Sequence, residues 1–123
     1  MKIRGLKGEL LDLLLEIGTA RHPYEFAGLL RETDGVIDEL NLVPGTVSSE
    51  ESASVLLDMM PLDTHVVGSV HSHPNGHIKP SLADLGFFSR SGRYHIIVGY
   101  PYSRNDWRCF RVDGEPVPLE VFP

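Results

Sequence analysis

Residues 66–85 read VVGSVHSHPNGHIKPSLADL, and this stretch decides how the chain folds. Its first part, Val66 to His73, is apolar and β-branched enough to predict a strand. Residues 74–76, Pro-Asn-Gly, stop that strand. A helix is predicted from Ser81 to about Arg90, with Gly92 at its end. One short loop thus joins a strand to a helix.

Two histidines and an acid fall at the two ends of this loop. His71 and His73 are two residues apart on the predicted strand, so their side chains face the same way. Ser81 and Asp84 are three residues apart at the helix start and share a face. Two neutral imidazoles and one carboxylate are the ligand set of a catalytic zinc ion, which keeps a fourth position for water.

Structural roles are the alternative for the same residues. Ser81-x-x-Asp84 is close to a capping box, a role we expect these two residues to have in addition. An isolated pair of strand histidines would usually bond backbone groups, but Asp84 at this spacing favours the metal site. The other histidines are expected to be structural or solvated, with His77 in the connecting loop as a reserve ligand. They are His22, His65, His77 and His95.

Upstream of this stretch the pattern predicts a helix and a β-hairpin. Apolar residues recur with helical spacing over residues 6–20. A strand is predicted over residues 25–32, followed by Asp34-Gly35, a strong two-residue hairpin signal, and a returning strand over residues 36–43. Further on, we expect a polar loop over 46–52, a short strand over 54–57 and a turn at 59–61.

Downstream, three more strands are predicted. They cover residues 94–100, 107–112 and 117–122, with turns at Asn105-Asp106 and Asp113-Gly114. The whole chain, residues 1–123, is expected to be a single domain. Its fold class is α/β (α+β): a mixed, largely antiparallel sheet of about six strands packed with two main helices.

Composition narrows the function classes. The chain has 11 Lys and Arg against 17 Asp and Glu, a net charge of −6, so nucleic acid is a poor candidate partner. No apolar stretch approaches the length needed to cross a bilayer, and no secretory leader is expected, so a cytoplasmic location is predicted. The single cysteine, Cys109, rules out an internal disulfide, a Cys-based zinc site and the cysteine pair of zinc deaminases.

The pattern His71-x-His73-Pro74, six residues, Ser81-x-x-Asp84 resembles the signature of the JAMM (MPN+) metalloprotease family. That signature also needs an upstream glutamate, and Glu25 followed by Gly28 matches it. The resemblance is greatest to the short stand-alone JAMM proteins of archaea, and it implies an MPN/JAB-like fold with cytidine-deaminase-like layering.

The resemblance implies a role for each residue of the signature. His71, His73 and Asp84 would hold one Zn²⁺ per chain, with water as the fourth ligand. Glu25 would act as general base and pass the proton to the leaving amine. Ser81 would donate a hydrogen bond to the developing oxyanion. No role is implied for Cys109.

The resemblance also implies a substrate class, the amide or isopeptide bond after the C-terminal Gly-Gly of a ubiquitin-like protein. The chain lacks a second zinc site and long insertions, so a small archaeal-type modifier or a sulfur-carrier protein is the expected partner. A homo-oligomer is possible. The alternative is a nonenzymatic MPN-like scaffold that binds partner proteins. A cupin-like iron enzyme, also with two histidines and a carboxylate, is disfavoured by the two predicted helices.

Overall fold

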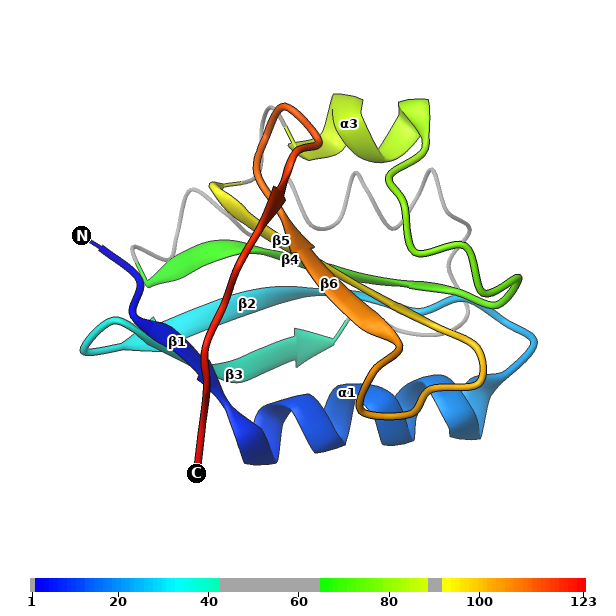
Figure 1. The fold of residues 1–123 in the computed structure, drawn as a ribbon, viewed down its shortest axis with the longest axis horizontal. Helices are drawn as coiled ribbons and strands as arrows, with labels where there is room; N and C mark the ends of the chain where they lie inside the picture. The colour runs from blue at the N-terminus through cyan, green and yellow to red at the C-terminus, as the bar shows by residue number, and fades with distance from the viewer. Residues whose placement is uncertain (1, 43–64, 89–91) are drawn as a thin grey trace.

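The computed structural model describes residues 2–42, 65–88 and 92–123, and these form a mixed sheet between two helices (Figure 1). The order of the strands is β7-β6-β5-β4-β2-β3-β1-β8. The helices are α1 (Gly8–Arg21) and α3 (Leu82–Phe88). The strands are β1 (Gly5–Lys7), β2 (Ala27–Thr33), β3 (Val36–Leu42), β4 (Val66–His73), β5 (Tyr94–Gly99), β6 (Trp107–Phe110), β7 (Pro116–Val117) and β8 (Val121–Phe122). No described helix has the length and apolar character of a transmembrane segment.

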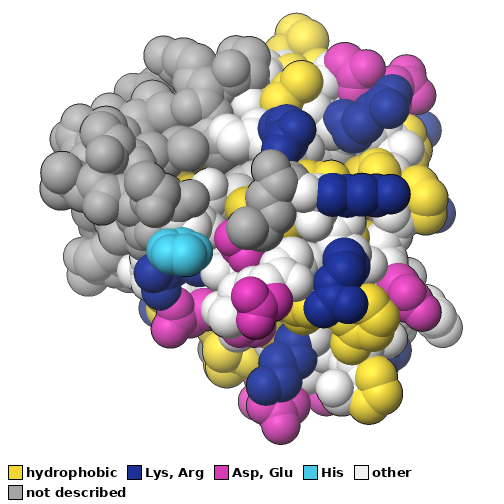
Figure 2. All heavy atoms as spheres, turned by 90° about the vertical axis from the view of Figure 1, so that its left-hand side faces the viewer, with side chains coloured by type: hydrophobic (Ala, Val, Ile, Leu, Met, Phe, Trp, Pro, Cys, Tyr) yellow, Lys and Arg dark blue, Asp and Glu magenta, His cyan; other side chains and the backbone are white. Residues whose placement is uncertain are grey.

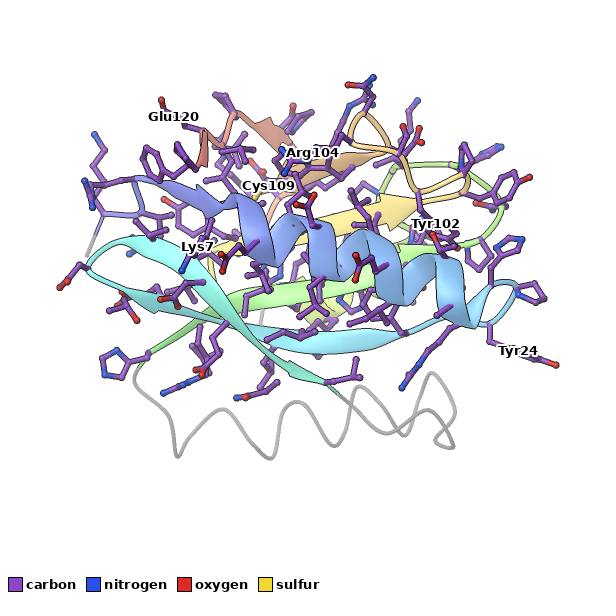
Figure 3. The ribbon with its side chains drawn as sticks, turned by 90° about the horizontal axis from the view of Figure 1, so that it is seen from below. Lys7, Tyr24, Tyr102, Arg104, Cys109 and Glu120 are labelled. Atoms are coloured by element: carbon purple, nitrogen blue, oxygen red, sulfur yellow. The ribbon has the colours of Figure 1, made fainter. Side chains whose placement is uncertain are left out.

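Helix α1 covers one face of the sheet, because its apolar residues recur on one side. Leu10, Leu11, Leu14 and Leu15 are buried there against alternate residues of the strands, such as Leu30, Val70, Ile96 and Val98. Figure 3 views this face and shows Tyr102 and Arg104 beside the helix. Arg104 donates a hydrogen bond from Nε to Asp12 Oδ1 at 2.9 Å, which ties the loop before β6 to α1.

Helix α3 covers part of the other face with a smaller apolar cluster. Phe87 and Phe88 pack there with Leu29, Ile97 and Phe110. Successive strand residues point to opposite faces, so Val70 and Ser72 share the face of α1 while Ser69, His71 and His73 share the face of α3. The fold thus turns both histidines of the signature toward the helix that carries Asp84.

Most predicted elements are confirmed with small changes in their bounds. Strand β4 has the predicted bounds, and Asp34-Gly35 forms the hairpin turn, with φ of 52° and 83° at its two residues. Positive φ at both central residues is typical of a type I′ turn, the usual two-residue connection of a β-hairpin. Glu25 and Phe26 precede β2 rather than belonging to it.

Three sequence predictions are corrected by the structure. Leu6 was placed in the first helix but lies in β1, where it is fully buried between β3 and β8. The last predicted strand, 117–122, is two short strands at opposite edges of the sheet. The sheet therefore has eight strands among the described residues instead of about six. Val43, the segments predicted at 46–52, 54–57 and 59–61, and the end of the second helix after Phe88 lie outside the described residues.

Candidate metal centre

The predicted ligands lie where β4 ends and α3 begins. His71 and His73 lie at the C-terminal end of β4, and their side chains face α3. Asp84 lies in the first turn of α3. His73 Nε2 is 3.1 Å from Asp84 Oδ2. The structure therefore brings together two of the three predicted ligands through side chains that are largely buried.

The other ring nitrogen of His73 fixes how this contact works. His73 Nδ1 is 2.7 Å from the backbone carbonyl oxygen of His77, which can only accept, so Nδ1 carries the proton. Two arrangements then allow Nε2 to lie this close to the Asp84 carboxylate. Either Nε2 carries a second proton and donates it, or a cation lies between the two atoms. The hydrogen bond with Asp84 raises the pKa of His73 above its usual value, against the effect of burial. A metal ion would replace that proton.

Asp84 is held as an anion. Burial raises its pKa, but hydrogen bonds from His73 and from the backbone of Ser81 outweigh burial and bring the pKa to about 2. Two donor atoms on one tetrahedral zinc ion, each at about 2.0 Å, lie roughly 3.3 Å apart. The 3.1 Å between His73 Nε2 and Asp84 Oδ2 is close to that spacing. The donor types and their separation thus fit zinc.

Ser81 and Asp84 also form the expected capping box. The Ser81 N–H donates to Asp84 Oδ2 at 2.9 Å, and the Asp84 N–H donates to Ser81 Oγ at 3.1 Å. The hydroxyl of Ser81 accepts in this contact, so its own hydrogen remains to be donated to another group. The capping role and the predicted oxyanion role are therefore compatible.

His71 lies under α3 in a more apolar setting than His73. Its ring contacts Phe87 edge-on, with centroids 5.4 Å apart, and lies 6.0 Å from the Phe88 ring. Burial and the neighbouring His73 lower its pKa to about 4, although the charge of Asp84 opposes this. Its Nε2 is 3.0 Å from Ser69 Oγ. Within residues 2–42, 65–88 and 92–123, no three His, Cys, Asp or Glu side chains converge as a metal-binding group, so the three-ligand set stays a prediction.

Glu25 lies beside this pair just before β2. Ala27 pairs with His71, so two residues earlier the antiparallel register leads from Glu25 toward His73. The hydrogen bond with Asp84 is the main cause of the raised pKa of His73, and the charge of Glu25 adds a smaller contribution in the same direction. Ser72 fixes the backbone next to Glu25, because its buried Oγ accepts a 2.7 Å hydrogen bond from the Phe26 N–H.

Two further residues contact or surround His71. The sequence prediction for His95 is a structural or solvated role, and its complete burial agrees with a structural one; the sequence predicts no role for Ser69, which is also fully buried. Ser69 Oγ lies 2.8 Å from His95 Nδ1 and contacts His71 as well. The signal that links them is register, since Ser69 and His95 pair across β4 and β5, and sequence alone does not reveal which strands are neighbours.

The remaining histidines and the cysteine place no side chain at the predicted ligands within the described part of the chain. His77 offers its backbone oxygen to His73, and its ring has no contact with another described residue that supports a ligand role. His22 contacts the Tyr102 hydroxyl and His65 lies near Glu32. Cys109 is buried, and burial raises the pKa of its thiol to about 12, so it stays protonated.

Comparison with known proteins assigns this fold, with its histidine pair and Asp84 at a strand-to-helix junction, to the JAB domains. The family model described as prokaryotic homologs of the JAB domain matches residues 8–113. The chain is 45% identical to a probable metalloprotease of Haloferax volcanii, over 98% of this chain and 80% of that one.

Two solved structures give the same result. A JAB1/MPN domain protein from Archaeoglobus fulgidus is 40% identical, with a TM-score of 0.79 and complete coverage of both chains. A structure described as a JAMM metalloprotease-like zinc site in the proteasome and signalosome is 38% identical, with a TM-score of 0.80 over 99% of this chain and 100% of that chain. The chain belongs to the prokaryotic JAB-domain family, a branch of the JAMM/MPN metalloprotease-like proteins.

Proposed function

We propose that this chain is a zinc-dependent isopeptidase or peptidase. Its substrate is the amide or isopeptide bond after the C-terminal Gly-Gly of a ubiquitin-like or sulfur-carrier-like modifier. The observation that carries the proposal is the pair of His73 Nε2 and Asp84 Oδ2, 3.1 Å apart, next to which the β2–β4 register leads from Glu25 toward His73. The Haloferax volcanii relative described as a probable metalloprotease and the similar structure described as a JAMM metalloprotease-like zinc site support it.

Each residue has a defined part in this proposal. His71, His73 and Asp84 hold one zinc ion per chain, and zinc supplies Lewis acidity and lowers the pKa of water. Glu25 takes a proton from the attacking water and delivers it to the leaving amine. Ser81 donates its O–H to the carbonyl oxygen as negative charge develops there. Phe87 and Phe88 shield the His71 side of the site from solvent.

The proposal also covers partners and location. A Gly-Gly tail is narrow and can lie extended beside a strand, so a modifier conjugate is the partner that we propose, with no nucleic acid and no membrane. The net charge of −6 disfavours a phosphate backbone. Figure 2 views the end of the molecule at the left of Figure 1 and shows Lys and Arg side chains interleaved with Asp and Glu. A cytoplasmic location and a possible homo-oligomer complete the proposal.

The direct test is hydrolysis of Gly-Gly-linked conjugates with and without a chelator. We expect the zinc-loaded chain to release the modifier, the chelator to stop release, and added Zn²⁺ to restore it. Glu25→Gln is expected to keep stoichiometric zinc and to lose turnover by about 10²-fold or more. Glu16→Gln, on the exposed surface of α1, is the matched control and should leave the rate unchanged. A Glu25→Gln variant that turns over at the wild-type rate contradicts the mechanism.

A nonenzymatic scaffold is the alternative function, and the same experiment separates the two. A scaffold would bind partner proteins equally well after chelation and would show no zinc at stoichiometric protein. The retained Glu25, His71, His73, Ser81 and Asp84 favour the enzyme, since a scaffold has no use for a zinc-binding pair and a neighbouring carboxylate.

A further inference from the structure

A chain of hydrogen bonds runs from His71 into the interior of the molecule. Ser69 Oγ lies 3.0 Å from His71 Nε2 and 2.8 Å from His95 Nδ1. His95 Nε2 lies 3.0 Å from the backbone oxygen of Gly92. We name the four residues Gly92, His95, Ser69 and His71 the buried hydrogen-bond chain. Ser69 and His95 are fully buried, and their strands β4 and β5 are paired at these two residues.

The contact between His95 and Gly92, at the inner end of the buried hydrogen-bond chain, shows which group donates at each step. The Gly92 carbonyl can only accept, so His95 Nε2 must carry a proton and donate it. The His95 ring stacks on Phe88, with centroids 4.1 Å apart and planes inclined by 7°, inside the apolar cluster under α3. A charged imidazole is costly in such a fully buried, apolar place, so His95 is neutral and its Nδ1 accepts.

The same reasoning assigns donor and acceptor at Ser69 and then at His71. The Ser69 hydroxyl donates its single hydrogen to His95 Nδ1, and its oxygen accepts from the second neighbour. That neighbour is His71 Nε2, which must therefore carry the proton of a neutral His71 ring. The lone pair of His71 that can bind a metal is then on Nδ1. Histidine ligands usually donate their other N–H to a fixed acceptor in this way.

We propose that Ser69 and His95 are positioning residues for the metal centre. They fix the tautomer of His71, with the proton on Nε2, and they hold its ring so that the Nδ1 lone pair is presented for zinc. His73 uses its backbone contact at His77 for the same purpose with the opposite nitrogen. The part of this inference that concerns zinc rests on the proposed function, whereas the tautomer of His71 does not.

The tautomer is measured directly in the metal-free wild-type protein. A long-range ¹H–¹⁵N spectrum distinguishes protonated from unprotonated ring nitrogens, and His71→Gln and His95→Gln assign the signals. We expect a neutral His71 with its proton on Nε2 near neutral pH. In His95→Phe, which keeps an aromatic ring against Phe88, the freed Ser69 hydroxyl should donate to His71 and move the proton to Nδ1. A metal-free wild-type His71 with its proton on Nδ1 overturns the inference.

Zinc affinity is the second measurement, made by competition with a chelator of known affinity. We expect Ser69→Ala and His95→Phe each to weaken zinc binding by about 10- to 100-fold, the usual effect of removing such a supporting contact. Ser72→Ala is the matched control. It also removes a buried hydroxyl from β4, but that hydroxyl faces α1 and bonds the Phe26 N–H. It should bind zinc within about threefold of wild type.

The outcomes distinguish the inference from the proposed function. Wild-type zinc affinity in Ser69→Ala and His95→Phe, with zinc lost in His71→Ala, overturns the positioning role and leaves the function standing. Wild-type affinity in His71→Ala overturns the ligand assignment of the proposed function instead. The spectrum of the metal-free protein then still decides whether the buried hydrogen-bond chain sets the tautomer.

Discussion

At the scale of single residues, Asp84 combines two tasks that usually need two side chains. One oxygen, Oδ2, accepts the Ser81 N–H at the start of α3 and also faces His73 Nε2. The helix start and the predicted metal site therefore share the same atom. A change at Asp84 is expected to affect both the stability of α3 and zinc binding, and Ser81 separates the two effects.

Ser81→Ala is predicted to cost about 1 kcal/mol of stability, because it removes the acceptor for the Asp84 N–H. It leaves the Ser81 N–H and its contact with Asp84 Oδ2 in place. We therefore expect zinc affinity close to wild type together with a loss of turnover. Urea unfolding, chelator competition and a cleavage assay measure the three quantities. Unchanged turnover would contradict the oxyanion role of Ser81.

The buried His95 predicts a pH dependence of stability. Its pKa is lowered from 6.5 to about 4, mainly by burial, so the folded chain binds this proton less well than the unfolded chain. The contribution of His95 to the free energy of unfolding is therefore fully present above pH 6.5, and it is lost as the pH falls toward about 4. The shift corresponds to about 3 kcal/mol.

His95→Phe should flatten this dependence, measured as the free energy of unfolding between pH 7 and pH 4 with metal removed. His22→Phe, at an exposed histidine, is the control and should keep the wild-type slope. Because His71 also has a lowered pKa, part of the slope is expected to remain in His95→Phe. An unchanged slope in His95→Phe would contradict the neutral, buried state of this ring.

At the scale of elements, the two helices respond differently to the same substitution. Gly86 lies in α3, and an added Cβ would meet no atom of the described residues within 4 Å apart from its chain neighbours and its own helix backbone, so Gly86→Ala is predicted to stabilise the chain by up to about 1 kcal/mol. Gly18 lies in α1, where a Cβ would come within 2.6 Å of the Tyr102 ring. Gly18→Ala should therefore destabilise despite its better helix propensity. Thermal unfolding of both variants checks the contrast, and destabilisation by Gly86→Ala would contradict it.

The elements also show what the sequence could and could not predict. The hairpin at Asp34-Gly35 and the bounds of β4 depend on local patterns, and both are confirmed. Leu6 was misassigned because a fully buried leucine fits a helix stripe and a central strand equally well. The last segment was read as one strand because nothing local reveals that β7 pairs with β6 while β8 pairs with β1.

The same limit applies to the site. His71, His73 and Asp84 are predicted as zinc ligands from spacings within 14 residues, and the structure places His73 Nε2 3.1 Å from Asp84 Oδ2. The contact between Ser69 and His95 was not predicted, because it depends on which strands are neighbours, a property of the folded sheet. Local spacing thus predicts a strand-to-helix junction well and predicts its support from another strand poorly.

At the scale of the whole molecule, zinc should stabilise the fold by mass action. At a zinc concentration 100 times the dissociation constant, a ligand that binds only the folded state adds about 2.7 kcal/mol. For a domain of this size we expect a rise in Tm of about 10 °C. His73→Ala should abolish the rise. An equal rise in His73→Ala would show that zinc stabilises the chain at some other place.

The path of the chain through the sheet separates the site into two parts. The three predicted ligands lie in one continuous segment, β4 followed by α3, next to β5. Glu25 reaches them only when β2 pairs with β4, and the contact from Phe26 to Ser72 spans 46 residues. Closing the larger loop costs more entropy, so the nearer contacts can form first. During refolding with metal present, zinc uptake should precede the return of hydrolysis, and the chain would pass through a state that holds its metal before it acquires its base.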